Sequence, residues 1–109
     1  MFGNLGKMMK MAQEMKSKLP EVQAQIEASQ HSASAGGDAV SATVNGRGAL
    51  IDIRIDPKAL AEGDAALLED LVKAAVSAAQ NKAVTYAAEV MKKLATDMGL
   101  PPGMEGMLG

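Results

Sequence analysis

Apolar and polar residues alternate along one stretch in the middle of the chain, residues 39–57, which reads AVSATVNGRGALIDIRIDP. Alternation with a period of two is typical of β-strands, and here it continues on both sides of Asn45-Gly46. Asn-Gly supplies the positive φ angles of a tight two-residue turn, whereas Gly48 allows a four-residue loop instead. Both loops predict one shared face, made of Val40, Ala42, Val44, Ile51, Ile53 and Ile55. The opposite face then carries Asp52, Arg54 and Asp56.

A helical pattern precedes this hairpin. Apolar residues recur at alternating spacings of three and four, and we call them the seam: Leu5, Met8, Ala12, Met15, Leu19, Val22 and Ile26. The seam predicts an amphipathic helix over about residues 4–26, regular enough for coiled-coil-like packing. Pro20 lies inside it and predicts either a kink or two helical pieces that meet there. The unbroken seam favours the kink.

The segment between this helix and the hairpin allows two interpretations. Residues 26–34, IEASQHSAS, form either the frayed end of the helix or an edge strand. An isolated two-stranded hairpin is rarely stable, so we favour a strand over about residues 27–34. It would pair with the first hairpin strand across Ala35-Gly36-Gly37.

A second, longer helix follows the hairpin. Asp56-Pro57 ends the last strand, residues 57–60 predict one helical turn closed by Gly63, and Asp64 is a good N-cap. A long helix is expected over about residues 64–98, with an apolar stripe of Leu68, Val72, Val76, Ala79, Ala83, Tyr86, Val90 and Leu94. Residues 99–109 are expected to form a flexible tail.

Together these patterns predict a single α+β domain over residues 1–98. Its order is a long N-terminal helix, a three-stranded antiparallel sheet with strands over about 27–34, 39–45 and 49–56, and a long C-terminal helix. A helix of residues 64–98 is roughly 50 Å long and cannot bury its whole stripe on so small a sheet. The rest of the stripe needs another helix, from the same chain or from a second copy. We expect a homodimer; the alternative is a monomer whose two helices pack as a hairpin.

Composition excludes most chemistry. The 109 residues contain no Cys and one His, His31, with no acid close to it in sequence, so a solvated or sheet-edge histidine is expected. Glu62, Asp64, Glu69 and Asp70 gather at a helix start, where the macrodipole favours negative charge. We therefore expect no enzyme, no cofactor, no metal site and no small-molecule substrate. Without Cys or a run of about 20 apolar residues, the chain suits a reducing cytoplasm, with no membrane expected.

Lysines supply the one functional signal in the composition. The formal net charge is −2, but residues 1–20 carry four lysines against one glutamate, and residues 21–70 carry nine acids against three bases. Lys7 and Lys10 lie on the first helix, and Lys92 and Lys93 lie near the end of the last. If both helix ends project from the sheet, these lysines form a common basic arm that neutralises phosphates. The residues by themselves favour the simpler interpretation of ordinary solvated lysines.

Five pieces of the sequence change that balance. The start MFGNLGKMMKMAQ, the strand VSATVNG, the I-D-P that closes the hairpin, the run LLEDLVKAA and the tail LPPGM occur in order along nearly the whole chain. Together they resemble the YbaB/EbfC family of nucleoid-associated proteins. The resemblance implies an α-β-β-β-α fold, a tweezer-like homodimer, DNA as the partner, a nucleoid location, and roles in nucleoid organisation and gene regulation. The family's basic N-terminal segment matches Lys7 and Lys10, with Lys16 and Lys18 further along. Lys92 and Lys93 enter as DNA-binding candidates through the charge argument alone.

Two other functions remain open. The Met-rich seam is suited to adaptable recognition, so the chain is alternatively a protein-interaction or assembly module that docks a partner. A third option is a peripheral membrane helix over residues 5–19, with its lysines at lipid head groups.

Overall fold

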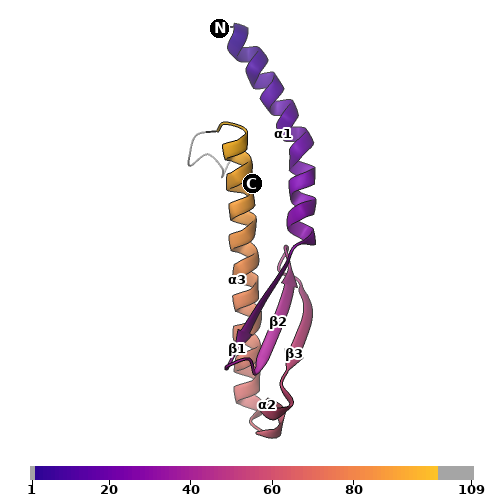
Figure 1. The fold of residues 1–109 in the computed structure, drawn as a ribbon, viewed down its shortest axis with the longest axis vertical. Helices are drawn as coiled ribbons and strands as arrows, with labels where there is room; N and C mark the ends of the chain where they lie inside the picture. Colours follow the sequence, from indigo (N-terminus) through magenta and orange to yellow (C-terminus); the bar gives the residue numbers. More distant parts are fainter. Residues whose placement is uncertain (1, 101–109) are drawn as a thin grey trace.

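The computed structural model describes residues 2–100, with side chains from residue 4 onward. It confirms the predicted α+β class and the order α-β-β-β-α (Figure 1). The elements are α1 (Phe2–Ala28), β1 (Gln30–Ala35), β2 (Val40–Asn45), β3 (Leu50–Ile55), the short α2 (Pro57–Ala61) and α3 (Ala65–Asp97). The predicted flexible tail falls largely on residues 101–109, which lie outside the described residues.

The three strands form one antiparallel sheet in the order β1-β2-β3. Residues 26–34 therefore divide between two elements: α1 continues to Ala28, and β1 pairs with β2 from Gln30 onward. The loop between β2 and β3 is the longer of the two alternatives, with Gly46 to Ala49 between the strands. Its positive φ, 85°, lies at Gly48 rather than at Asn45-Gly46. The Asn45 carboxamide oxygen accepts hydrogen bonds from the backbone N–H groups of Arg47 and Ala49, at 2.9 and 3.0 Å, and closes this loop.

The predicted facing of the hairpin holds for two of the three isoleucines. Val40 lies opposite Ile55 and Ala42 opposite Ile53, so these pairs share the inner face. A β-bulge follows, because Thr43 pairs with Asp52 while Val44 pairs with Leu50. Ile51 is the extra residue of this bulge and is 49% exposed. The prediction that Ile51 shares the inner face was wrong, because a bulge shifts the side chains by one position.

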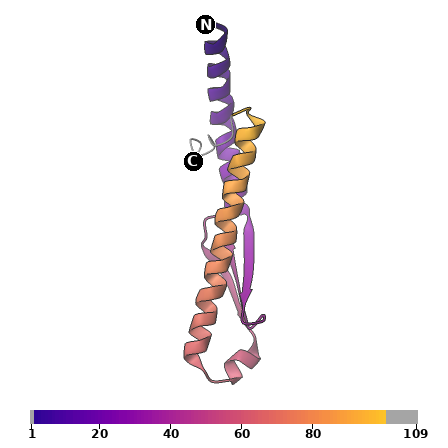
Figure 2. The same ribbon diagram turned by 90° about the vertical axis from the view of Figure 1, so that its left-hand side faces the viewer.

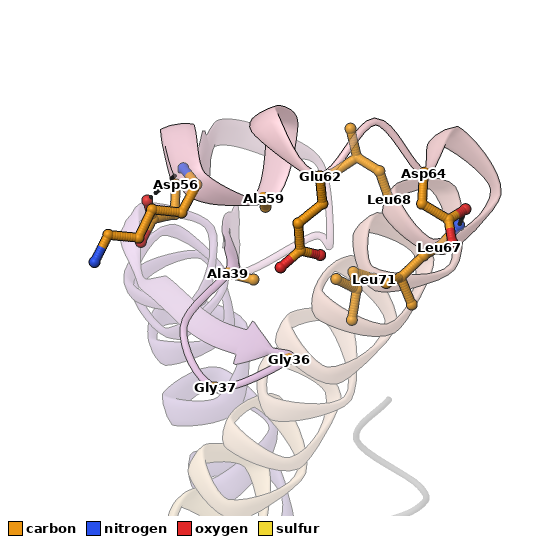
Figure 3. Close-up of a pocket in the computed structure, with 11 residues that line it drawn as sticks. Gly36, Gly37, Ala39, Asp56, Ala59, Glu62, Asp64, Leu67, Leu68 and Leu71 are labelled. Carbon is orange, nitrogen blue, oxygen red and sulfur yellow. Dashed lines mark hydrogen bonds between the residues drawn. The ribbon is translucent and has the colours of Figure 1, made fainter.

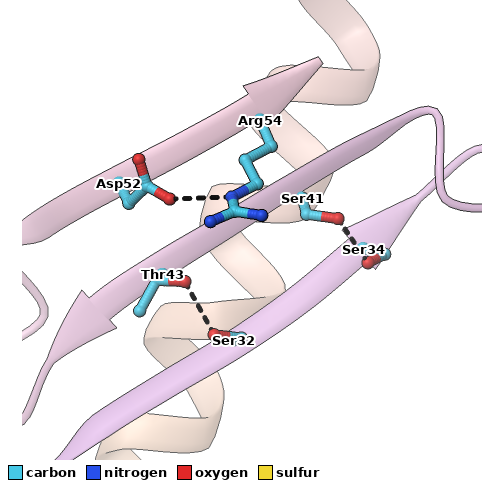
Figure 4. Close-up of polar contacts among 6 residues, drawn as sticks. All are labelled: Ser32, Ser34, Ser41, Thr43, Asp52 and Arg54. Atoms are coloured by element: carbon cyan, nitrogen blue, oxygen red, sulfur yellow. Dashed lines mark hydrogen bonds and ion pairs between the residues drawn. The ribbon is translucent and has the colours of Figure 1, made fainter. Parts of the chain in front are cut away.

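The core lies between the inner face of the sheet and α3. Val40, Ala42 and Val44 are fully buried there against three alanines of α3, Ala75, Ala79 and Ala83. Alanines allow the helix backbone to approach the strands closely, which explains why the middle of α3 is rich in alanine. Figure 2 shows α3 lying along one side of the sheet only. The other face of the sheet is polar, with hydroxyl pairs Ser32–Thr43 at 2.7 Å and Ser34–Ser41 at 2.8 Å (Figure 4).

Beyond the sheet, α1 and α3 run side by side. A second buried cluster joins them, formed by Leu94 and Ala95 of α3 and its C-cap Met98, with Met11, Met15, Leu19 and Val22 of α1. The same chain thus supplies the second helix that the upper stripe of α3 needs. Ala12, predicted to lie in the seam, is exposed, and Met11 contacts the cluster instead. Leu5 and Met8 of the seam extend past the end of α3 and are 56% and 67% exposed.

The molecule is a rod rather than a sphere. Its principal extents are 71 × 22 × 16 Å and its radius of gyration is 19.9 Å. A compact domain of this length would have a radius of gyration of about 13 Å. We call residues 4–25 of α1, together with residues 88–97 of α3 and its C-cap Met98, the arm. The sheet, α2 and residues 65–87 of α3 form the hub.

Pro20 lies inside α1 without ending it, so the helix is one piece, as the unbroken seam favoured. Proline lacks the N–H that would bond to the preceding turn and crowds that turn, which bends a helix. In Figure 1 the N-terminal part of α1 slants away from the direction of its C-terminal part.

Candidate nucleic-acid interface

All six candidate lysines are exposed and lie on the arm. Four come from α1 and two from α3, namely Lys7, Lys10, Lys16, Lys18, Lys92 and Lys93. They share one end of the rod because α3 returns antiparallel to α1, which brings its C-terminal turns beside the middle of α1 (Figure 1). The positive end of the α1 dipole lies at the same tip and adds to their potential.

The lysines do not form one compact patch. With 3.6 residues per turn, Lys7, Lys10 and Lys18 lie within roughly 80° of one another around α1, whereas Lys16 lies on the other flank. Lys92 and Lys93 precede Leu94 and lie outside the stripe of α3 that contacts α1. The lysines are thus spread along the arm and over several of its sides, with Glu14 among Lys7, Lys10 and Lys18 on one flank of α1. This arrangement suits contact with a polyanion better than capture of a single small anion.

None of these ammonium groups is neutralised by an ion pair within residues 2–100. The ion pairs of this part of the chain join Arg47 to Glu27 at 3.2 Å and Arg54 to Asp52 at 3.3 Å. Both lie at or near the sheet, away from the arm tip. The arm lysines are thus available for phosphate groups without first losing a protein partner.

Several acids gather at the far end of the hub, whereas four others lie on the arm itself: Glu14, Glu21, Glu89 and Asp97. Asp56 caps α2 through the Lys58 N–H at 2.9 Å, and Asp64 caps α3 through the Leu67 N–H at 3.0 Å, as predicted for Asp64. Exposed charges are screened over about 8 Å at physiological ionic strength, a small fraction of the length of the rod. The net charge of −2 therefore does not describe the arm: the acids of the hub end are too distant to cancel its lysines, and its own six lysines outnumber its four acids.

A small polar and aromatic cluster fixes the arm where it meets the hub. Gln25 Nε2 donates to the Tyr86 hydroxyl at 3.1 Å, and the ring of Tyr86 packs on that of His31 with centroids 5.0 Å apart. His31 lies on the edge strand β1, and its Nε2 is 2.9 Å from the Ser29 hydroxyl. Its environment is that of a structural residue that positions α1 against α3. The sequence placed Tyr86 in the apolar stripe of the long helix but did not predict its pairing with Gln25, because the two residues lie 61 positions apart.

Two further cations lie on the polar face of the sheet. Lys82 donates to the Ser32 carbonyl oxygen at 2.7 Å, and Arg54 is paired with Asp52 (Figure 4). Both are held by protein groups, unlike the arm lysines. Across residues 2–100, no group of acids and histidine is placed to hold a metal ion, and no helix is long and apolar enough to cross a membrane.

Comparison with known proteins agrees with this geometry. The sequence profile of the YbaB/EbfC DNA-binding family matches residues 1–98. A nucleoid-associated protein of Granulibacter bethesdensis is 41% identical over 102 residues, covering 94% of this chain and 95% of that protein. A nucleoid-associated protein of Clostridium perfringens is 43% identical over 99 residues, covering 91% of this chain and 88% of that protein.

A solved structure shares the fold. The crystal structure of an uncharacterized protein from Helicobacter pylori matches with a TM-score of 0.56 and 25% identity, covering 80% of this chain and 96% of that one. The matching family is described by DNA binding and not by an enzymatic activity. The profile match over nearly the whole chain, together with these relatives, shows that the protein belongs to the YbaB/EbfC DNA-binding family.

Proposed function

We propose that this protein is a dimeric, nucleoid-associated DNA-binding protein that holds the phosphate backbone between basic helical arms and acts in nucleoid organisation and gene regulation. The observation that carries the proposal is the separation of charge along the rod. The arm carries six exposed lysines, none ion-paired within the described residues, against four acids, a local charge of +2, whereas the other described residues carry eight acids against five cations. The names of the relatives, which are nucleoid-associated proteins, support a nucleoid location.

The mode of contact follows from the chemistry of the arm. Lysine is a point charge on a flexible stem and binds phosphate oxygens without reading a base edge. The arm carries no arginine or aromatic side chain over residues 4–25 or 88–98, the groups typical of base readout and base stacking. Binding is therefore expected to be weakly dependent on sequence and strongly dependent on salt.

Dimerisation rests on apolar surface that the single chain leaves uncovered. Around the hub, Leu50, Ile51 and Leu60 are each about half exposed, and Val84 on α3 is 69% exposed. Large apolar side chains left exposed on a single chain are candidates for an interaction surface. In a symmetric pair joined at the hub, two arms project from one body, and each can approach the same duplex.

A mobility-shift series across salt concentration tests the proposal. We expect a retarded complex at low salt that is lost as salt rises, with little difference between unrelated duplexes. The double variant K7E/K10E should weaken binding to every duplex at least tenfold, because it reverses two phosphate-facing charges per arm. The matched control is K58E/K73E, which reverses two exposed lysines of the hub and should bind as the wild type does. Equal losses in both double variants, or binding indifferent to salt, would refute the arm as the contact surface.

The solution mass tests the dimer separately. A single chain has a mass of 11.2 kDa. Sedimentation equilibrium should give twice that mass for the wild type and for K7E/K10E alike. A monomer at micromolar concentration would contradict the dimer. It would not bear on the assignment of the DNA-binding lysines, which the mobility-shift series tests.

A further inference from the structure

The tip of the arm carries apolar residues that no part of residues 2–100 covers. Leu5, Met8 and Met9 are 56%, 67% and 66% exposed, because the cluster between α1 and α3 begins only at Met11. Lys7 and Lys10 lie between and beside them on the same helix turns. The tip is thus both apolar and positively charged. Such a surface is complementary to an apolar surface bordered by acids.

A cavity with the complementary properties lies at the other end of the molecule. It has a volume of about 320 Å³ and is enclosed by the turn at Gly36 and Gly37, by α2 and by the first turns of α3 (Figure 3). Its apolar wall is formed by Leu67, Leu68 and Leu71, and Leu67 is 45% exposed.

The border of this cavity is acidic. Asp56, Glu62 and Asp64 line it, with Lys58 as its one cation. Figure 3 shows the Glu62 carboxylate pointing across the space between Ala39 and Leu71. Asp56 and Asp64 each cap a helix through one oxygen, whereas Glu62 has no such structural duty. Glu62 is therefore the acid best placed to meet an incoming cation.

A chain cannot place its own tip in its own cavity. The cavity lies at the start of α3, the tip lies beyond the end of α3, and the 33 residues of that helix separate them by about 50 Å. We propose that the tip of one copy, residues 5–10, docks in the hub cavity of another copy. Met8 and Leu5 would contact the leucine wall, and Lys7 and Lys10 would meet Glu62 and its acidic neighbours.

This contact joins two different surfaces, so it does not close on itself. A head-to-tail contact between elongated bodies generates open chains rather than a fixed oligomer. The docking needs no DNA and is independent of the DNA-binding proposal. If both hold, phosphates and the cavity compete for Lys7 and Lys10, and a duplex releases docked tips.

Sedimentation velocity without DNA tests the docking. At low salt, the weight-average mass of the wild type should rise above that of the smallest stable species as protein concentration increases. It should fall again when salt is added. E62K places a cation at the cavity mouth and should weaken this association about tenfold or more, since a like charge then faces the tip. The matched control is E69K, an exposed acid on the opposite side of α3, which should assemble as the wild type does.

A charge exchange separates docking from a general loss of solubility or folding. K7E/K10E should also lose the species of higher mass, while its far-ultraviolet circular dichroism spectrum and the mass of its smallest stable species stay unchanged. The triple variant E62K/K7E/K10E returns an opposite charge at residue 62, while Asp56 and Asp64 stay acidic, and should regain part of the assembly that its parents lose. A mass independent of concentration, an E62K variant that assembles like the wild type, or a triple variant that remains as dissociated as its parents would each overturn the proposal.

Discussion

The backbone of Gly46 lies directly against the carbonyl group of Ile26, so closely that no Cβ fits at residue 46. This contact places the loop between β2 and β3 under the last turn of α1. The Arg47–Glu27 ion pair at 3.2 Å joins the same two segments. The root of the arm is therefore held by the hairpin loop as well as by the short link to β1, and the direction of α1 depends on this glycine.

The first prediction is that Gly46→Ala disturbs the arm root. The added methyl group overlaps the Ile26 carbonyl, and backbone atoms must shift to admit it. We expect a loss of stability of about 1–3 kcal/mol in urea unfolding, the range of overpacked sites. Gly48→Ala is the control, because its cost comes from the φ of 85° and its nearest neighbour lies 3.8 Å away, in ordinary contact. When affinity is measured on the folded fraction of each variant, only Gly46→Ala should bind DNA more weakly than the wild type. Equal DNA affinity for the two variants would argue against a role of Gly46 in directing the arm.

The hairpin illustrates how far the sequence predicts this fold. The alternation of Val40, Ala42, Ile53 and Ile55 predicts both strands and their buried face, because burial on one face imposes a period of two. Ile51 continues the same alternation and yet turns outward. A bulge is set by the geometry of the loop and the pairing partner, and the pattern of residue types carries no trace of it.

The second prediction concerns the two separate cores. Leu94 is 6% exposed in the arm cluster and Val44 is fully buried in the hub. Leu94→Ala leaves a cavity and should lower the free energy of unfolding by about 2–5 kcal/mol at most. The loss should be smaller if the arm opens locally while the hub stays folded.

Hydrogen exchange distinguishes these two outcomes. In Leu94→Ala, the amides of residues 11–22 should lose protection while those of β2 keep it. In Val44→Ala, the amides of the hub and the arm should lose protection together. Loss of protection in β2 for both variants would show that the molecule has a single cooperative core.

The arm shows what sequence patterns leave open. The seam of α1 predicts an amphipathic helix through Pro20, and that helix is present. The seam does not predict where a partner helix stops, since this depends on how α3 returns from the hub. Consequently Met15 and Leu19 are covered, whereas Leu5 and Met8 are exposed. Counting charges identified the lysines and suggested a common arm only on the condition that both helix ends project from the sheet, a condition that the antiparallel path of α3 meets.

The third prediction tests the start of α3. Asp64 accepts a hydrogen bond from the Leu67 N–H, so Asp64→Ala removes a helix cap and should lower stability by about 1 kcal/mol. Urea unfolding should show a lower midpoint with an unchanged slope. Asp70→Ala is the control, because Asp70 is exposed in the second turn and caps nothing. A similar loss from both substitutions would mean that negative charge at this helix start matters more than the cap.

The fourth prediction, and the most direct test of the arm, is the salt dependence of DNA affinity in variants that remove charge without reversing it. Each lysine that contacts a phosphate should contribute about one unit to the slope of log Kobs against log salt concentration. K7Q/K10Q should therefore lower that slope by about two for each arm that contacts the duplex, while K58Q/K73Q leaves it unchanged. A slope unaltered by K7Q/K10Q, or lowered equally by K58Q/K73Q, would contradict the assignment of phosphate binding to the arm.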